Sequence, residues 1–406
     1  MPRATGQSMT DVRWLLLFGV WLIYLLFGLV IASIAPLVPR IAADLGAGAG
    51  TMGLVMGAWP FVYILAALPA GTLLDRIGVR RGLLIAVVVM AASALLRGMA
   101  GSTFTLALAV ALFGVGGPLI SVGAPKLIAE LFQGRARGTA MGIYISGPAI
   151  GGITALSLTN SVLLPLAGGD WRRVMMAQAV LVLLGGAVWL AITATPAARR
   201  LLAGIGTAGK YNPAAFREVI ASAEVRLVLA MAVAVFAINH GLNNWLPSVL
   251  IAKGMTATSA GYWAAVPSVV GIVAALVVPG LARADRQVAI FMALALSMLV
   301  ATLLFQLASP VALALGLVLQ GIARGTMMTL AMMLLMESRD VPRDRLGMAG
   351  GLFFTTAEIG GVLGPVVFGA LVQGTGGFAV PVAAISGVCL ALLGLLAVLA
   401  RHRRWG

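Results

Sequence analysis

Charged residues are scarce in this chain of 406 residues, of which only 10% are charged and 61% are hydrophobic. A soluble protein of ordinary composition carries about 25% charged residues, so this composition excludes a soluble globular fold. Acids are the rarer sign, with 12 Asp and Glu against 27 Lys and Arg. Cys389 is the single cysteine, which excludes an intrachain disulfide and is typical of a thiol used in packing.

Signals of enzyme chemistry are missing as well. No group of His, Cys, Asp or Glu has the spacing of a metal site. No phosphate-binding loop of the Walker type is present, so ATP hydrolysis within this chain is not expected. The sequence therefore predicts no enzyme, no catalytic residue, no metal and no cofactor.

Long apolar runs fill most of the chain. Runs of 19–27 residues recur along its length, and each is long enough to cross a hydrocarbon layer about 30 Å thick as a helix. We predict an all-α membrane protein with twelve transmembrane helices in two pseudo-symmetric six-helix bundles. The predicted spans are 14–38, 51–73, 82–100, 104–129, 138–164, 173–194, 226–250, 259–281, 287–308, 310–336, 346–372 and 378–400.

Basic residues are distributed unevenly around these spans. If the N-terminus is cytoplasmic, 21 of the 27 Lys and Arg lie on the cytoplasmic side, five lie outside and Arg324 lies within a span. The positive-inside rule then places both termini in the cytoplasm of a bacterial inner membrane. The formal net charge of +15 is explained by topology and by membrane lipids, so no nucleic-acid partner is expected. Arg97, near the outer end of the third span, is expected to extend its charged end to the membrane surface.

The longest predicted cytoplasmic connection divides the chain in two. We expect an N-terminal six-helix bundle at 1–194, a linker at 195–225 and a C-terminal six-helix bundle at 226–406. Within the linker, Asn212-Pro213 is a helix-start signal. The mixed apolar and charged run that follows, 214–226, predicts a short amphipathic helix at the membrane surface.

The two halves resemble each other at an offset of 207–210 residues. Gly138 to Gly152 reads GTAMGIYISGPAIGG, and Gly347 to Gly361 reads GMAGGLFFTTAEIGG. Two parallel six-helix repeats predict a substrate site between them near the middle of the membrane, with alternating access by rocking.

The connection after the second span carries a recognisable motif. Residues 71–81 read GTLLDRIGVRR, which resembles the signature loop of the major facilitator superfamily. The resemblance implies a loop that closes the cytoplasmic face, in which Asp75 contacts a neighbouring helix end and the basic residues pair with acids such as Glu130. The alternative is a solvated basic loop that sets topology. The gating residues predicted in this way are Gly71, Asp75, Arg76, Gly78, Arg80, Arg81, Glu130 and, in the repeat, Asp285 and Arg286.

Three further segments refine this resemblance. Residues 147–152, GPAIGG, are similar to a glycine and proline motif of exchangers and suit helices that slide past one another. Many members carry an arginine in the fourth span, but residues 106–113 have no charge, so proton handling by that motif is not expected. Residues 243–247, NNWLP, are similar to the cyanate and nitroimidazole transporter-like branch, which implies a small anionic or polar substrate.

Arg324 and Glu358 are the only base and the only acid that fall deep within the predicted spans. A charge at mid-bilayer costs roughly 2.5–3.5 kcal/mol, so we predict a function for both. Arg324 can hold a carboxylate with its forked donors; the alternative is a structural ion pair with Glu358. We expect Glu358 to pair with Arg324 in the empty site and to take up a proton when an anion displaces it. The alternative is a permanently protonated carboxyl bonded to a neighbouring carbonyl.

Polar side chains gather past the middle of the seventh span. Asn239, His240, Asn243 and Asn244 are helical neighbours, and unpaired amides are costly in lipid, so we expect them to bind substrate. A packing role is the alternative for His240. Tyr24 of the first span joins the same cavity if that span is rotated as the resemblance implies.

Together these features predict a monomeric secondary transporter that moves a small anionic solute by alternating access, linked to protons. Two alternatives stay open. A drug/proton antiporter would use Glu358 to attract cations, although Arg324 argues against a cavity for cations. A membrane sensor that keeps the transporter fold would need a soluble output domain, which is not expected here.

Overall fold

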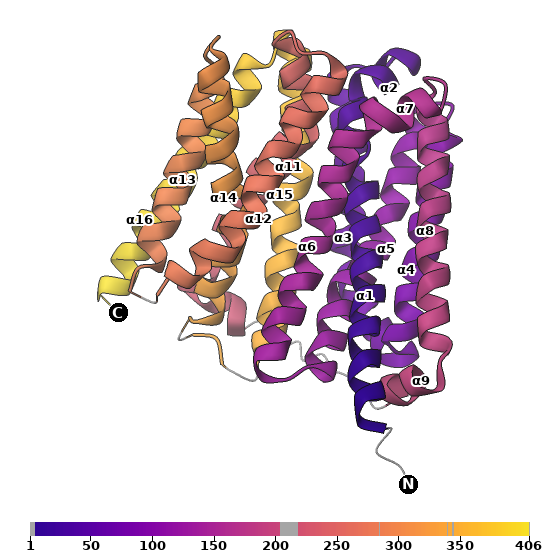
Figure 1. Cartoon of the computed structure of the whole chain (residues 1–406). Coiled ribbons are helices and arrows are strands. Elements are labelled where there is room, and N and C mark those ends of the chain that lie inside the picture. Colours follow the sequence, from indigo (N-terminus) through magenta and orange to yellow (C-terminus); the bar gives the residue numbers. More distant parts are fainter. Residues whose placement is uncertain (1–4, 204–217, 284, 339, 343–344, 406) are drawn as a thin grey trace. The chain divides into compact units, whose positions relative to one another are not determined.

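The computed structural model describes residues 5–203, 218–283, 285–338, 340–342 and 345–405, and these residues are nearly all helical (Figure 1). Twelve segments of the described residues are long and apolar enough to cross a membrane. The predicted all-α fold with twelve spans is therefore confirmed. The amphipathic helix predicted at 214–226 falls partly outside the described part of the chain, which does not include residues 214–217.

Internal packing divides the chain into two compact units. Unit 1 comprises Met1–Ile34 and Leu65–Gly209, and unit 2 comprises Ala35–Ile64 and Lys210–Gly406. This division differs from the bundles expected from the sequence, because residues 35–64 pack with the second unit. The bundle boundaries at 194 and 226 stay a prediction.

Unit 1 is built on α1, which packs along α6 and α8, while α4 packs against α5 and α8 (Figure 1). The residues of α3 from Leu65 onward also belong to this unit. Its helices are α1 (Thr5–Ala32), α4 (Val79–Gly98), α5 (Thr103–Leu131), α6 (Gly134–Leu158), the π-helical turn η2 (Thr159–Leu163), α7 (Leu164–Leu166), α8 (Trp171–Ala194) and α9 (Pro196–Ala203).

Unit 2 is built on two close helix pairs, α11 with α15 and α12 with α14, and α13 packs against both α14 and α16 (Figure 1). The first part of α3, up to Ile64, belongs here. α3 as a whole runs over Ala49–Ile77. The other elements of unit 2 are η1 (Ala35–Leu37), α2 (Val38–Asp44), α11 (Ala223–Ala252), α12 (Ala257–Leu281), α13 (Gln287–Leu304), α14 (Pro310–Met336), α15 (Leu346–Thr375) and α16 (Ala379–Trp405).

Hydroxyl side chains define where several helices begin. Ser102 accepts a hydrogen bond from the N–H of Thr105 and forms a capping box at the start of α5. Ser222 and Ser309 cap α11 and α14 in the same way, each accepting from a backbone N–H of the first turn. The cap at Ser222 starts α11 at Ala223, three residues earlier than predicted.

The first span is broken near its end, and Arg97 occupies the break. α1 ends at Ala32 and the chain continues through η1 into α2, because Pro36 has no N–H with which to continue the helix. Arg97 is only 1% exposed and donates from Nη1 to the main-chain oxygen of Val30 at 2.9 Å. Its guanidinium lies 5.4 Å from the centre of the Phe113 ring. The expectation that Arg97 reaches the membrane surface is therefore wrong, because the free carbonyls at the end of α1 attract a cation inward.

One glycine contact occurs in both units and matches the sequence repeat. In unit 1, the Cα of Gly151 faces the main chain of Leu25 and Leu29 so closely that a side chain would overlap them. In unit 2, Gly360 faces Val233 and Ala237 in the same way. The partners are 208 or 209 residues apart in each case, so the repeat seen in the sequence has a structural counterpart within α1·α6 and α11·α15.

Candidate functional site

Arg324 lies in the middle of α14 and is held against α12. Its Nη1 donates to the hydroxyl of Ser268 at 2.5 Å. The glycines beside it bring the two helices together, since a Cβ at Gly321 would lie 2.8 Å from the main-chain oxygen of Pro267. Among the described residues the guanidinium makes no other hydrogen bond and no ion pair. Most of its five N–H groups are therefore available to a ligand.

Glu358 lies on α15 and is buried, with 6% of its surface exposed. Its Oε2 has no hydrogen-bond partner in the described part of the chain. The predicted ion pair with Arg324 is not formed there either, because Ser268 turns the guanidinium toward α12 whereas the carboxyl faces α11. The carboxyl occupies the space that a side chain at Gly361 would fill, and His240 Nδ1 lies 3.3 Å from the same point.

His240 is clamped between two aromatic rings. Trp59 of α3 and Phe236 of α11 each lie 5.5 Å from it, centre to centre, at interplanar angles of 28° and 17°. Stacking on these two rings restricts the orientation of the imidazole, whose ring nitrogens can meet a polar partner. Arg324 is the charged group that acts on this ring electrostatically. The structure thus brings Arg324, His240 and Glu358 into one polar region of unit 2.

The asparagines of α11 differ in their surroundings. Asn244 donates from Nδ2 to the main-chain oxygen of His240 at 2.8 Å, which satisfies the amide within its own helix. Asn239 keeps a buried Oδ1 without a partner among the described residues. Asn243 is half-buried. Of the three, Asn239 therefore has the buried polar atom without a protein partner that is expected of a ligand-binding residue.

Two buried polar residues of unit 2 were missed by the sequence reasoning. Gln320 lies one turn before Arg324 on α14, is 1% exposed, and its Oε1 has no partner in the described part of the chain. Ser268 is 6% exposed and holds Arg324. Gln320 could have been found, because an amide inside an apolar span needs a partner. Ser268 could not have been found, because it lies on α12 and its sequence position gives no indication that it contacts α14.

Tyr24 lies in unit 1, within an aromatic stack. Its ring is 4.6 Å from that of Tyr144 with an interplanar angle of 4°, and 5.5 Å from that of Phe27. Phe27 in turn lies 4.9 Å from Phe113. The side chain of Tyr24 is half-buried, and its predicted contact with substrate stays a prediction.

The signature loop is anchored through Asp75. Its carboxylate forms an ion pair of 2.8 Å with Lys126 of α5, so Asp75 contacts a neighbouring helix as the resemblance implied. Gly78 turns the chain into α4 with a φ of 79°, a backbone conformation that favours glycine. Gly71 has open space beside it.

The basic residues of this loop are not paired as expected. Arg76, Arg81 and Glu130 are exposed and Arg80 is half-buried. The ion pairs within the described residues include none between these arginines and Glu130. Lys126 takes the acid of the loop instead.

The repeat of the loop in unit 2 behaves differently. Asp285 and Arg286 form an ion pair with each other at 3.6 Å, and both are largely exposed. Gln287 donates to Glu337 of the neighbouring helix end at 2.8 Å. Within the described part of unit 2, no ion pair like that of Asp75 with Lys126 anchors Asp285 to another helix.

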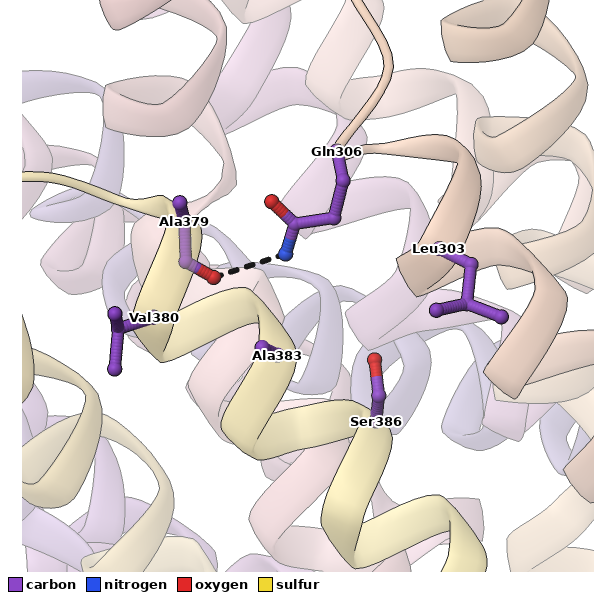
Figure 2. Close-up of a pocket in the computed structure, with 6 residues that line it drawn as sticks. All are labelled: Leu303, Gln306, Ala379, Val380, Ala383 and Ser386. Atoms are coloured by element: carbon purple, nitrogen blue, oxygen red, sulfur yellow. Dashed lines mark hydrogen bonds between the residues drawn. The ribbon is translucent and has the colours of Figure 1, made fainter.

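A shallow pocket between α13 and α16 lies apart from the charged residues (Figure 2). Gln306 donates across it to the main-chain oxygen of Ala379 at 2.9 Å. Its six lining residues carry no charge and are mostly apolar. It has none of the groups that would select an ion, so the region around Arg324 is the stronger candidate.

Comparison with known proteins agrees with this architecture. The chain is 24% identical over 412 residues to a "Probable galactarate/D-glucarate transporter GudP" of Bacillus subtilis, covering 91% of this chain and 88% of that protein. It is 25% identical over 412 residues to a D-galactonate transporter of Escherichia coli O6:H1, covering 88% of this chain and 89% of that protein. The crystal structure of the nucleoside transporter NupG superposes with a TM-score of 0.74 at 14% identity, covering 96% of this chain and 99% of NupG.

The sequence profile of the Major Facilitator Superfamily matches residues 20–340. That match extends across most of the chain and includes the signature loop anchored by Asp75. The protein is thus a multi-pass membrane transporter and not an enzyme, and it belongs to the Major Facilitator Superfamily.

Proposed function

We propose that this protein is a secondary transporter for small hydroxylated carboxylates of the sugar-acid type, and that Arg324 binds the carboxylate. The observation that carries the proposal is the unneutralised guanidinium in the middle of α14, bonded among the described residues only to the neutral Ser268. A charge removed from water is costly unless it is paired. An anionic solute supplies that pair, and an arginine holds a carboxylate with two parallel hydrogen bonds.

Hydroxyl groups on the solute fit the remaining polar atoms. Gln320 Oε1 and Asn239 Oδ1 are buried acceptors without donors among the described residues. A solute with hydroxyl groups can donate to them, whereas an anion without O–H groups, such as cyanate or acetate, cannot. The relatives named for galactarate, D-glucarate and D-galactonate support this class of substrate.

We propose that transport is linked to protons through Glu358. When an anion neutralises Arg324, the site is neutral only if the buried carboxyl holds a proton. A carboxylate there would place a second negative charge beside the bound anion in a region of low dielectric. Anion and proton should therefore be bound together.

The same proposal includes topology and gating. Both termini lie on the cytoplasmic side of the inner membrane. The excess of Lys and Arg in the connecting segments on that side supports this orientation. The ion pair between Asp75 and Lys126 then belongs to the cytoplasmic gate, and a monomer is the working unit.

A smaller substrate such as cyanate is the second candidate. It is favoured by the run from Trp245 to Pro247, which resembles the cyanate and nitroimidazole transporter-like branch. Trp245 is buried and donates from Nε1 to the main-chain oxygen of Pro365 at 3.1 Å. This bond gives the run a packing role that needs no particular substrate, so we rank the candidate second.

The test is stabilisation of the purified protein by ligands. D-Galactonate, D-glucarate, cyanate and tetraphenylphosphonium would be added to the wild type, Arg324→Ala and Arg324→Lys, with Arg173→Ala as a control at an exposed arginine. A ligand at a hundred times its Kd stabilises the folded state by about 2.7 kcal/mol. We expect the sugar acids to raise the melting temperature of the wild type and the control, but not of Arg324→Ala.

Each other outcome changes the conclusion. Stabilisation by cyanate alone would favour the second candidate. Stabilisation by tetraphenylphosphonium that survives in Arg324→Ala would favour the drug/proton antiporter and make Glu358 the binding residue. Sugar acids that stabilise Arg324→Ala as well as the wild type would contradict the role of Arg324.

A further inference from the structure

Glu358 and His240 occupy a space that exists because residue 361 is glycine. A Cβ at Gly361 would overlap Glu358 Oε2 and lie 3.3 Å from both Cε1 and Nδ1 of His240. The carboxyl oxygen and the edge of the imidazole therefore converge on one point between α11 and α15. Stacking on Trp59 and Phe236 holds the plane of the ring.

The repeat shows that helix packing does not require these two side chains. The position of Gly361 corresponds to Gly152 in unit 1, where the atom nearest to an added Cβ is the Cβ of Ala32, at 3.8 Å. At the same offsets, Ala32 corresponds to His240 and Ala149 to Glu358. The α1·α6 pair therefore has alanines at the two positions where the α11·α15 pair has an imidazole and an acid. The α1·α6 pair packs closely without an imidazole or an acid at these positions.

The charge of Arg324 acts on His240 through space. No ion pair joins Arg324 to Glu358 within the described residues. Arg324 therefore influences this pair through its charge and not through a direct bond.

Other titratable groups of the packed helices are few. α15 contains no ionisable side chain besides Glu358. α11, α14, α16 and α3 pack against it. Apart from His240 and Arg324, these helices contain the following titratable residues: Glu224 and Arg226 of α11, Cys389, Arg401, His402, Arg403 and Arg404 of α16, and Tyr63, Asp75 and Arg76 of α3. Except for Cys389 and Tyr63, they lie in the first or last turns of their helices.

We propose that His240 and Glu358 together form the proton-binding site of the transporter: no hydrogen bond joins Glu358 Oε2 to the imidazole within the described residues, and uptake of one proton draws the carboxyl and the imidazole edge together so that they share it. This inference rests on the proposed function, because it specifies how that function is linked to protons. The proton comes from solvent, and its two positions are Glu358 Oε2 and an edge nitrogen of His240. In either position the pair carries the same total charge, so the anion-bound site is neutral while the proton is present.

Loss of this proton at high pH leaves a net negative charge beside the anion bound to Arg324. The affinity for a monovalent sugar acid is then expected to fall tenfold for each pH unit above the transition. His240 stabilises the shared proton by about one hydrogen bond, of order 1.4 kcal/mol. Its removal should therefore move the transition to lower pH by about one unit, since one pH unit corresponds to 1.36 kcal/mol.

The experiment measures the Kd of D-galactonate for the purified full-length protein between pH 6 and pH 10. The variants are His240→Phe, which keeps an aromatic ring between Trp59 and Phe236, Glu358→Gln, and Gly361→Ala, whose methyl group displaces the carboxyl. Gly152→Ala is the matched control at the repeat position. We expect the transition to be absent in Glu358→Gln, about one unit lower in His240→Phe and Gly361→Ala, and unchanged in Gly152→Ala.

The failures are distinguishable. If the affinity of the wild type depends on pH and His240→Phe shows the same transition, the proton is not shared with His240. That outcome would overturn this inference and leave the proposed function intact. A wild type that binds D-galactonate with no pH dependence would remove proton linkage and this inference together. A wild type that binds no sugar acid would overturn the proposed substrate class and, with it, the inference.

Discussion

Arg97 donates a hydrogen bond to the main-chain oxygen of Val30 at 2.9 Å and thereby closes the broken end of α1 from within unit 1. Its substitution Arg97→Met would keep the volume of the stem but remove this hydrogen bond, so that the Val30 carbonyl would keep only the donor from the Ser33 hydroxyl. A hydrogen bond to a charged group contributes about 1.5–3 kcal/mol. We expect thermal unfolding in detergent to show a loss of this size.

The control for this prediction is Arg173→Met. Arg173 is 69% exposed and, among the described residues, forms an ion pair with Asp170 alone, three residues earlier, so its removal should leave the melting temperature nearly unchanged. Equal losses in the two variants would contradict the role of Arg97 at the end of α1.

Gly360→Ala should separate α11 from α15. The added methyl would overlap the main-chain oxygen of Val233, and a main-chain atom cannot move aside as a flexible side chain can. Overpacking of this kind costs typically about 1–3 kcal/mol. Gly351→Ala on the same helix has open space and should be neutral or slightly stabilising, because alanine favours helix more than glycine does. Thermal unfolding of the two variants side by side tests the contact.

Ser268→Ala should weaken anion binding without abolishing it. The hydroxyl holds Arg324 in one direction, and a guanidinium that has lost this partner must be ordered by the ligand itself. We expect the Kd of D-galactonate to rise about three- to tenfold, which corresponds to about 0.7–1.4 kcal/mol.

The comparison for Ser268→Ala is Ser297→Ala. Ser297 also donates to α14, to the main-chain oxygen of Leu319 at 3.1 Å, but does not touch Arg324. Isothermal titration should give the wild-type Kd for Ser297→Ala. A similar rise in both variants would mean that general support of α14, and not the position of Arg324, sets the affinity.

The ion pair of Asp75 with Lys126 should affect transport rate more than stability. The two side chains are 26% and 19% exposed, and pairs of this kind contribute about 0.2–1 kcal/mol. Asp75→Lys should slow uptake of labelled D-galactonate into proteoliposomes, because two cations would then face each other at the loop. The double exchange Asp75→Lys with Lys126→Asp restores an ion pair and should recover much of the rate. A double variant as slow as the single one would argue that the loop acts without this pair.

The twelve spans could be predicted from the sequence because each depends only on a local run of apolar residues. The repeat was also visible, since the matching segments at 138–152 and 347–361 keep the glycines that pack one helix on another. Helix ends were less predictable. The break after Ala32 depends on Pro36, and the start of α11 depends on the cap at Ser222, neither of which changes the apolar pattern.

The functional residues were harder to predict, because their partners come from distant segments. Arg324 and Glu358 were found by their charge, but their expected pairing was not observed. Ser268 turns Arg324 to one helix, and Gly361 admits Glu358 beside another. Nothing in the sequence indicates toward which helix either of these two side chains points. In the same way, Arg97 looked like a surface residue because the carbonyls it binds belong to a helix that ends 65 residues earlier.

The contacts of Gly151 and Gly360 are made between main chains, and this has a consequence for how such a transporter changes its substrate in evolution. Main-chain contacts are the same whatever side chains stand next to them, so residues beside the glycines are free to vary without loss of the helix pair. One copy of the repeat has alanines at these positions, and the other has an acid and an imidazole. New solutes can therefore be selected by a few exchanges around an unchanged scaffold, and old ones can be lost in the same way.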